Sequence, residues 1–353
     1  MILQRYILKE LLTSFLFAFA TILAVCLLGT LFQVFRSLEG LGFDLLLRVT
    51  PMATGYVAPW AMAVASCTSA TLVYGRLAAE NEIDAMRMSG VHTARIVTPA
   101  VFFGIILIFA AYGINEHAAP AAHFARRKMI RESVLTLLRL PPPGNQRFTI
   151  GPYKLSYVDY RNGRMERPYL MRFDRHGLAE EFRAASGRVD LSGPLPQIIM
   201  SRPTMTRIDP SGKVSNATAG NDFPVPLEIE DIYEIQKRLD DMSLRELWET
   251  YWRTAEKPRR SAILTTIHTR YAQSLAPLFL VLVAMPIGIY VKRGSRLAGL
   301  GAALPPLLIY FVLYFVFQGM GDKDRVPPVV AAYAPDACLM TVSLVLLGTV
   351  FRR

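Results

Sequence analysis

Six long runs of apolar residues constrain this chain more than any other feature of its sequence. They cover residues 11–35, 51–74, 96–115, 271–291, 297–317 and 329–350. The hydrocarbon core of a bilayer is about 30 Å thick, and about 20 apolar helical residues cross it. Each run meets that length, and 52% of the 353 residues are hydrophobic. The pattern therefore predicts an α-helical membrane protein with six transmembrane helices.

The three cysteines and the first apolar run need no secretory or redox explanation. The first run is too long for the apolar region of a signal peptide, so we expect it to be a span. Cys26, Cys67 and Cys338 all fall inside predicted spans. We interpret them as buried thiols and predict neither disulfides nor a metal site from them.

Basic residues in the short loops predict the orientation of the chain. The loops and termini on one side contain Arg5, Lys9, Arg76, Arg87, Arg95, Lys292, Arg293, Arg296, Arg352 and Arg353. The short loops on the other side carry balanced charges. Since cytoplasmic loops carry an excess of Lys and Arg, we predict that both termini are cytoplasmic. Membrane topology and a basic insert also explain most of the net charge of +11, so we do not expect nucleic-acid binding.

A polar insert between the third and fourth runs divides the chain into three parts. We predict spans 1–3 in residues 1–117, the inserted domain in 118–265 and spans 4–6 in 266–353. Turn sequences such as Arg161-Asn162-Gly163 separate short strand-like segments over 148–229. This spacing is typical of an antiparallel β-sandwich or jelly roll. Ser243-Leu244-Arg245-Glu246 predicts the start of a helix that leads back to the membrane.

The insert contains candidates for binding but no constellation that indicates catalysis or a metal site. Arg127 and Arg131, with Arg126 and Lys128, follow the third span on the same side as the insert. They fit either the solvated face of a helix or a cradle for lipid phosphates. Arg36, at the end of the first span, is a further candidate phosphate contact; a side chain that reaches toward lipid headgroups is the alternative.

The loop between the second and third spans predicts a charged helix at the membrane surface over residues 76–90. Ala79, Ile83 and Met86 fall on one face of such a helix, and Glu80, Asp84 and Arg87 on another. Gly90 is expected to end it. The apolar face can insert into a groove of a soluble protein; an amphipathic loop that lies on the membrane is the alternative.

The residues of this loop resemble a known family of permeases. The matching residues are Tyr74-Gly75-Arg76-Leu77, Asn81-Glu82-Ile83, Ala85, Arg87 and Ser89-Gly90. Met1 to Glu10, His268-Thr269-Arg270-Tyr271-Ala272 with Pro277, and Pro286-Ile287-Gly288 through Arg293-Gly294-Ser295-Arg296 match in the same order. Together they resemble the lipopolysaccharide export permeases LptF and LptG, also called YjgP and YjgQ. The N-terminal segment is closer to the LptF type.

The resemblance implies a function, a location and a set of partners. A permease of this family pairs with a second one in the bacterial inner membrane and binds a cytoplasmic ABC ATPase dimer. The pair passes lipopolysaccharide through periplasmic jelly-roll domains to a periplasmic bridge protein of similar fold. By this match Glu82 is the coupling acid, in a segment with Arg76, Ile83, Met86, Arg87 and Gly90. The sequence contains no G-x-x-x-x-G-K-[ST] motif, so ATP and Mg²⁺ are expected in the partner ATPase and not in this chain, which we predict to be no enzyme.

Two other functions fit parts of the pattern. A non-transporting scaffold of the cell envelope would use the insert only to dock partners. A secondary lipid transporter driven by an ion gradient would place charged residues inside the spans. Asp336, near the outer end of the sixth run, is the main acidic residue of that kind.

Overall fold

The computed structural model describes residues 2–37, 43–174, 177–193, 195–208, 214–227, 237–291 and 296–352. They form two compact units. The membrane unit contains Met1–Leu28, Met52–His123 and Lys237–Arg353, and the β unit contains Gly29–Pro51 and Phe124–Gln236. We describe each unit separately.

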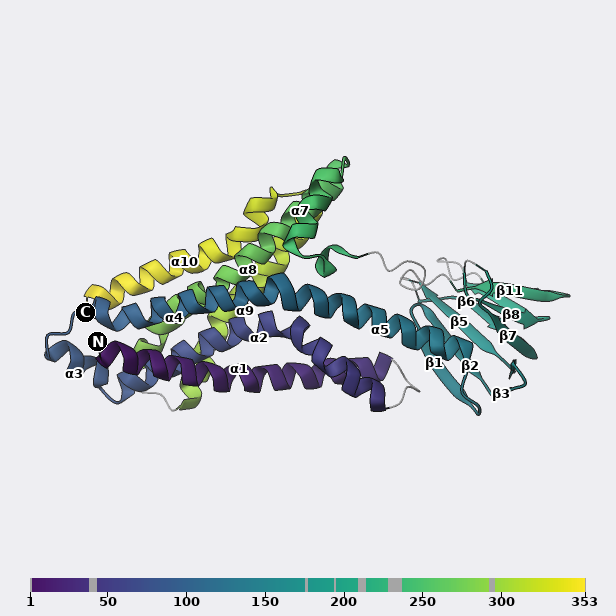
Figure 1. The fold of residues 1–353 in the computed structure, drawn as a ribbon, viewed down its shortest axis with the longest axis horizontal. Helices are drawn as coiled ribbons and strands as arrows, with labels where there is room; N and C mark the ends of the chain where they lie inside the picture. The colour runs from purple at the N-terminus through teal and green to yellow at the C-terminus, as the bar shows by residue number, and fades with distance from the viewer. Residues whose placement is uncertain are drawn as a thin grey trace. The chain divides into compact units, whose positions relative to one another are not determined.

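Within the described ranges, six helices are long and apolar enough to cross a bilayer, which agrees with the predicted number of spans. They are α1 (Ile2–Ser37), α2 (Phe43–Ala79), α4 (Thr93–Gly113), α8 (Lys257–Tyr290), α9 (Arg296–Asp322) and α10 (Pro328–Arg352). A π-helical segment, η1 (Ile114–Ala118), joins α4 to α5 (Ala119–Arg139) without a break. Both termini lie at the same end of the helical bundle (Figure 1). Several helices begin outside the apolar runs, because hydropathy detects only the part of a helix that lipid surrounds.

Glycines allow the helices of the membrane unit to approach closely. Gly75 of α2 faces Gly288 of α8, and a Cβ atom on Gly288 would lie 2.7 Å from the carbonyl oxygen of Thr71. On α4, Gly104 faces Leu278 of α8 in the same way. Small residues at helix crossings are typical of packing within membranes, where contact replaces the hydrophobic effect as the source of stability. These crossings place α8 against both α2 and α4.

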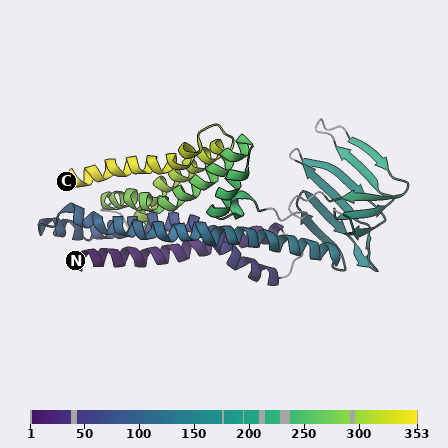
Figure 2. The ribbon, with the colours of Figure 1, turned by 45° about the horizontal axis from the view of Figure 1, so that its top comes forward.

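The described strands of the β unit form two antiparallel sheets, as was predicted for the insert. The six-stranded sheet has the order β1 (Gln146–Ile150), β2 (Tyr153–Tyr157), β5 (Tyr169–Asp174), β6 (Gly177–Arg183), β9 (Thr204–Ile208), β10 (Val214–Thr218). The five-stranded sheet has the order β11 (Asp222–Pro226), β8 (Gln197–Ser201), β7 (Ser186–Asp190), β4 (Arg164–Glu166), β3 (Asp159–Arg161). Figure 2 shows the two sheets as layers of a jelly-roll-like domain.

Local sequence explains the core and one turn of the β unit. Leu155, Met165, Leu170 and Ile198 are buried between the sheets, where Leu138 of α5 joins them. Asn162 and Gly163 have positive φ angles of 52° and 77° and connect β3 to β4. A two-residue turn of this kind favours Asn-Gly, because both positions require φ above zero.

The chain returns to the membrane through η2 (Leu239–Asp241) and α7 (Leu244–Arg253). The predicted capping box is confirmed: the Ser243 hydroxyl accepts from the Glu246 backbone N–H, and the Glu246 carboxylate accepts from the Ser243 N–H. Lys237 and the Ser243 N–H hold the pKa of Glu246 below its usual value. This segment belongs to the membrane unit, so the compact β unit ends earlier than the predicted domain 118–265.

Candidate functional site: the coupling helix and a polar cavity

The charged loop between α2 and α4 folds around a short helix, α3 (Glu82–Met88), here called the coupling helix. A single helix over 76–90 was predicted, and that prediction is wrong. Helix α2 ends at Ala79, and Asn81 takes the left-handed conformation with φ of 56°. Asn tolerates this conformation better than most residues, so the helix is interrupted there and a new helix begins at Glu82.

Gly90 ends the coupling helix, as predicted. Its φ is +81°, its N–H donates to the Arg87 carbonyl, and the Val91 N–H donates to the Met86 carbonyl. These two bonds form a Schellman motif, in which glycine avoids the steric penalty of the left-handed conformation. The length of the coupling helix is therefore fixed by local sequence at both ends.

The apolar face of the coupling helix is directed toward the helical bundle. Ile83 is 1% exposed within the core of the membrane unit, and Met86 packs against the same core. Met88 is 84% exposed and is a large apolar residue that points outward. Helical periodicity correctly grouped Ile83 with Met86 but could not decide between the bundle and a partner, and it gave no signal for Met88.

Hydrogen bonds tie the coupling helix and its flanking spans together. The buried Tyr74 hydroxyl of α2 donates to the Ile96 carbonyl of α4 at 2.8 Å. The Arg87 guanidinium donates to the Val350 carbonyl of α10 at 3.1 Å. These two bonds join α2 to α4 and the coupling helix to α10.

Charged side chains meet at the start of the coupling helix. Arg76 Nη1 lies 2.9 Å from Glu80 and 3.8 Å from Glu82. Burial and a hydrogen bond to the neighbouring Glu80 carboxyl raise the pKa of Glu82 above its usual value, although Arg76 opposes this. Glu82 is therefore an acid whose ionised form is only partly compensated within the chain.

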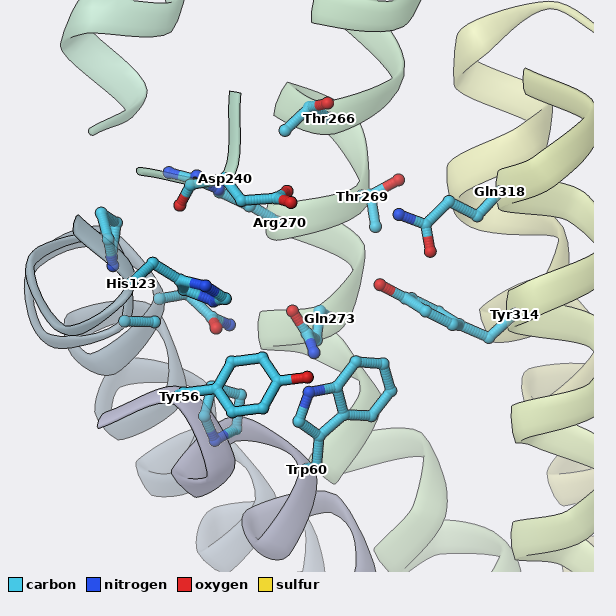
Figure 3. A pocket seen from close by; sticks show the side chains of 14 residues that line it. Tyr56, Trp60, His123, Asp240, Thr266, Thr269, Arg270, Gln273, Tyr314 and Gln318 are labelled. Atoms are coloured by element: carbon cyan, nitrogen blue, oxygen red, sulfur yellow. The ribbon is translucent and has the colours of Figure 1, made fainter. Parts of the chain in front are cut away.

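The other end of the bundle contains a polar cavity of about 210 Å³. It lies between α2, η1, α5, α8 and α9, and Tyr56, Trp60, Gln273 and Tyr314 project into it (Figure 3). The sequence analysis did not predict this cavity. Polar residues within the apolar runs are a possible sign of such a cavity, but their positions on separate helices do not show that they converge.

Arg270 forms one wall of the cavity and is only 9% exposed. Its guanidinium donates to the backbone carbonyls of Leu239 at 2.9 Å and Asp240 at 3.0 Å, and also to that of Met242. Asn115 of η1, which also lines the cavity, donates to the Ser274 hydroxyl at 3.0 Å. These bonds connect α8 to the return segment and to the third span.

The model of the lipopolysaccharide export system permease LptF/LptG family matches residues 5–349. The chain belongs to this family. No curated protein matches the chain. The match establishes the protein as a lipopolysaccharide export permease with several membrane-spanning helices.

The candidate phosphate contacts of this permease lie in two places. Arg127 and Arg131 are partly exposed and lie four residues apart on α5, so they share one face of that helix. Lys128 is 4.0 Å from Glu132, an exposed pair typical of a solvated helix. Arg36 lies in α1, but its side chain is outside the described part of the structure. Within the described residues, no cluster of three His, Cys, Asp or Glu side chains suits a metal ion.

Proposed function

We propose that this permease is the transmembrane subunit of an ABC-type lipopolysaccharide exporter in the bacterial inner membrane. It pairs with a second permease of the family, and a separate cytoplasmic ATPase dimer binds ATP and Mg²⁺. The observation that carries the proposal is the coupling helix. It is bonded and packed to several spans, yet it presents Met88 and part of Glu82 at its surface.

Lipid extraction requires an external source of energy. Each CH₂ group removed from the bilayer costs about 0.8 kcal/mol, and a lipid with several acyl chains contains many of them. The sequence has no phosphate-binding loop for ATP. A soluble ATPase that moves the coupling helix supplies the energy in this mechanism, and α2, α4 and α10 transmit the motion.

Exposed apolar surface supports the pairing with a second permease. Phe17 and Leu28 on α1, and Leu308 and Val312 on α9, are each more than half exposed in the isolated chain. Apolar surface inside a bilayer faces either lipid or another protein, and both suit a lipid substrate that moves between two permeases. The coupling helix and the termini are cytoplasmic in this arrangement.

The β unit supports transfer to a periplasmic bridge protein of jelly-roll fold. Its six-stranded sheet ends at β10, whose residues are exposed along the whole strand. An edge strand offers unpaired N–H and C=O groups to a strand of a partner. Pairing of sheet edges would extend the apolar interior of one domain into the next.

One observation favours a second candidate, a transporter driven by an ion gradient. Asp336 on α10 is 4% exposed, and neither carboxylate oxygen has a hydrogen-bond partner among the described residues. Acidic residues buried within spans often belong to ion or proton pathways. ATP-dependent release of lipopolysaccharide that continues after the ion gradients are collapsed would exclude this candidate.

Glu82 provides the test of the proposed function. Removal of a carboxylate that pairs with a partner's cation at a partly buried interface costs about 2–5 kcal/mol. We expect Glu82→Ala to reduce ATPase association and lipopolysaccharide release in proteoliposomes while the protein still inserts. Glu80→Ala is the matched control, because Glu80 is more exposed and lies closer to Arg76. Normal association and release by Glu82→Ala would contradict the proposal, and a scaffold would show no substrate-stimulated ATP hydrolysis in either form.

A further inference from the structure

The Arg76 guanidinium joins the coupling segment to the first helix, α1. Its Nη1 atom faces Glu80 and Glu82, at 2.9 Å and 3.8 Å. Its Nη2 atom faces α1, where it donates to the Tyr6 hydroxyl at 2.9 Å and forms an ion pair with Glu10. The two ends of one planar group therefore bind two different helical elements.

The α1 side of this contact is held in place by packing. Tyr6 and Glu10 are four residues apart and share a face of α1. Ile7 and Leu11, next to them in sequence, are fully buried in the core of the membrane unit. The first turns of α1 are thus fixed to the bundle, and Arg76 is the charged link between these turns and the coupling segment.

Farther along, α1 contacts the rest of the membrane unit with one face only. Phe17, Val25 and Leu28 are exposed, whereas Phe15, Phe19 and Ile22 on the other face pack on the core of the membrane unit. Since α1 is one continuous helix, a shift of its first turns is passed along the helix to this exposed face. Motion of the first turns of α1 would therefore reposition an apolar surface that the lipid substrate or the paired permease can contact.

The charges around Arg76 are unequal. One guanidinium serves three carboxylates, those of Glu10, Glu80 and Glu82. If a cation of the ATPase binds Glu82, it competes with Arg76 for that carboxylate, and Arg76 then pairs more strongly with Glu10. The planar fork of arginine suits this exchange because separate nitrogen atoms reach the two sides.

We propose that Arg76 is a positioning residue that transmits movement of the coupling helix to α1. The conformational change of the ATPase would then move the first span as well as α2, α4 and α10. The proposal rests on the proposed function, since it assumes that an ATPase engages Glu82. It adds α1 to the helices that move with the coupling helix, through the contacts of Arg76 with Tyr6 and Glu10.

The double variant Tyr6→Phe/Glu10→Ala tests this transmission. It removes the α1 partners of Arg76 and leaves Glu80 and Glu82 unchanged. In the complex with the ATPase, we expect ATPase association and ATP hydrolysis close to those of the wild type. Release of lipopolysaccharide should fall by roughly tenfold, a typical size for coupling between sites. Lys9→Gln, which removes an exposed charge from the same turns of α1, is the matched control and should change neither activity.

A second measurement separates transmission from a purely structural role. A Val25→Cys label, in a background without the three native cysteines, reports on the exposed part of α1. We expect its accessibility to change on nucleotide binding in the parent protein and to stay constant in the double variant. A normal change in the double variant, or release equal to that of the parent, would overturn the proposal. Loss of ATPase association would also overturn it, because Tyr6 and Glu10 would then belong to the docking surface. Failure of the Glu82→Ala test alone would instead count against the proposed function.

Discussion

At the scale of single residues, Arg270 makes a buried contact whose removal has a clear expected cost. Arg270→Met would leave three backbone carbonyls without their donor. Each buried polar group left unpaired costs about 1–3 kcal/mol, so three of them predict a loss of at least about 3 kcal/mol in unfolding free energy. Thermal unfolding of the detergent-solubilised protein measures this. Arg245→Met, which loses only an exposed contact with Glu249, should stay within about 0.5 kcal/mol of the parent. Equal stability of the two variants would contradict the role assigned to Arg270.

Glu82 predicts a dependence of ATPase association on pH. Its pKa is raised above the usual 4.5, first by burial and then by the Glu80 carboxyl. Only the ionised form pairs with a cation, so association should weaken as the pH falls through this raised pKa. The loss should therefore begin at a higher pH than an ordinary glutamate would give. Glu82→Gln should bind weakly and without this dependence; identical pH curves for the two proteins would show that Glu82 does not titrate at the interface.

The sequence predicted a helical, charged coupling segment but not the direction in which each of its side chains points. Periodicity placed Ile83 and Met86 on one face, and the structure shows that this face packs on the bundle. The link from Arg76 to Glu10 spans 66 positions in sequence, so no local pattern could predict it. Arg270 was visible only as part of a family-like motif, since its three carbonyl partners depend on the path of the return segment.

At the scale of elements, the contact between α2 and α8 depends on glycine. A Cβ atom on Gly288 would lie 2.7 Å from the Thr71 oxygen and 3.0 Å from the Gly75 nitrogen, both backbone atoms. Gly288→Ala should force the helices apart and destabilise the protein by about 1–3 kcal/mol, the usual cost of overpacking. Gly348→Ala on α10 is the control, because no atom lies within 4 Å of the added Cβ. Thermal unfolding measures the difference in stability between the two variants. An unchanged unfolding midpoint for Gly288→Ala would show that α2 and α8 can accommodate the added methyl group.

Elements formed by interactions between residues close in the sequence could be predicted, whereas those that depend on residues far apart could not. Apolar runs and turn residues act locally, so the spans, the β unit and the Ser243 capping box were predicted correctly. The break at Asn81 and the π-helical segment at Ile114–Ala118 were not predicted. Both occur within sequences that form ordinary helices equally well, and tertiary contacts such as that of Asn115 with Ser274 accompany the departure from regular helix.

At the scale of the whole molecule, the proposed export path requires the coupling helix and the β unit to be on opposite sides of the membrane. The even number of spans places both termini at one end of the bundle, and the coupling helix is at that end too (Figure 1). The excess of Lys and Arg in the adjacent loops predicts that this end is cytoplasmic. The β unit follows the third span, so it must face the periplasm if that assignment holds.

Cysteine labelling tests this orientation directly. Ser192, in the turn after β7, and Ser89, at the end of the coupling helix, are both exposed. Each would be changed to Cys in a protein in which Cys26, Cys67 and Cys338 are replaced by alanine. A membrane-impermeant maleimide added outside intact spheroplasts should label Ser192→Cys and not Ser89→Cys, whereas both should react after the membrane is disrupted. Labelling of Ser89→Cys alone in intact spheroplasts would invert the topology, and an ATPase in the cytoplasm could then not reach Glu82.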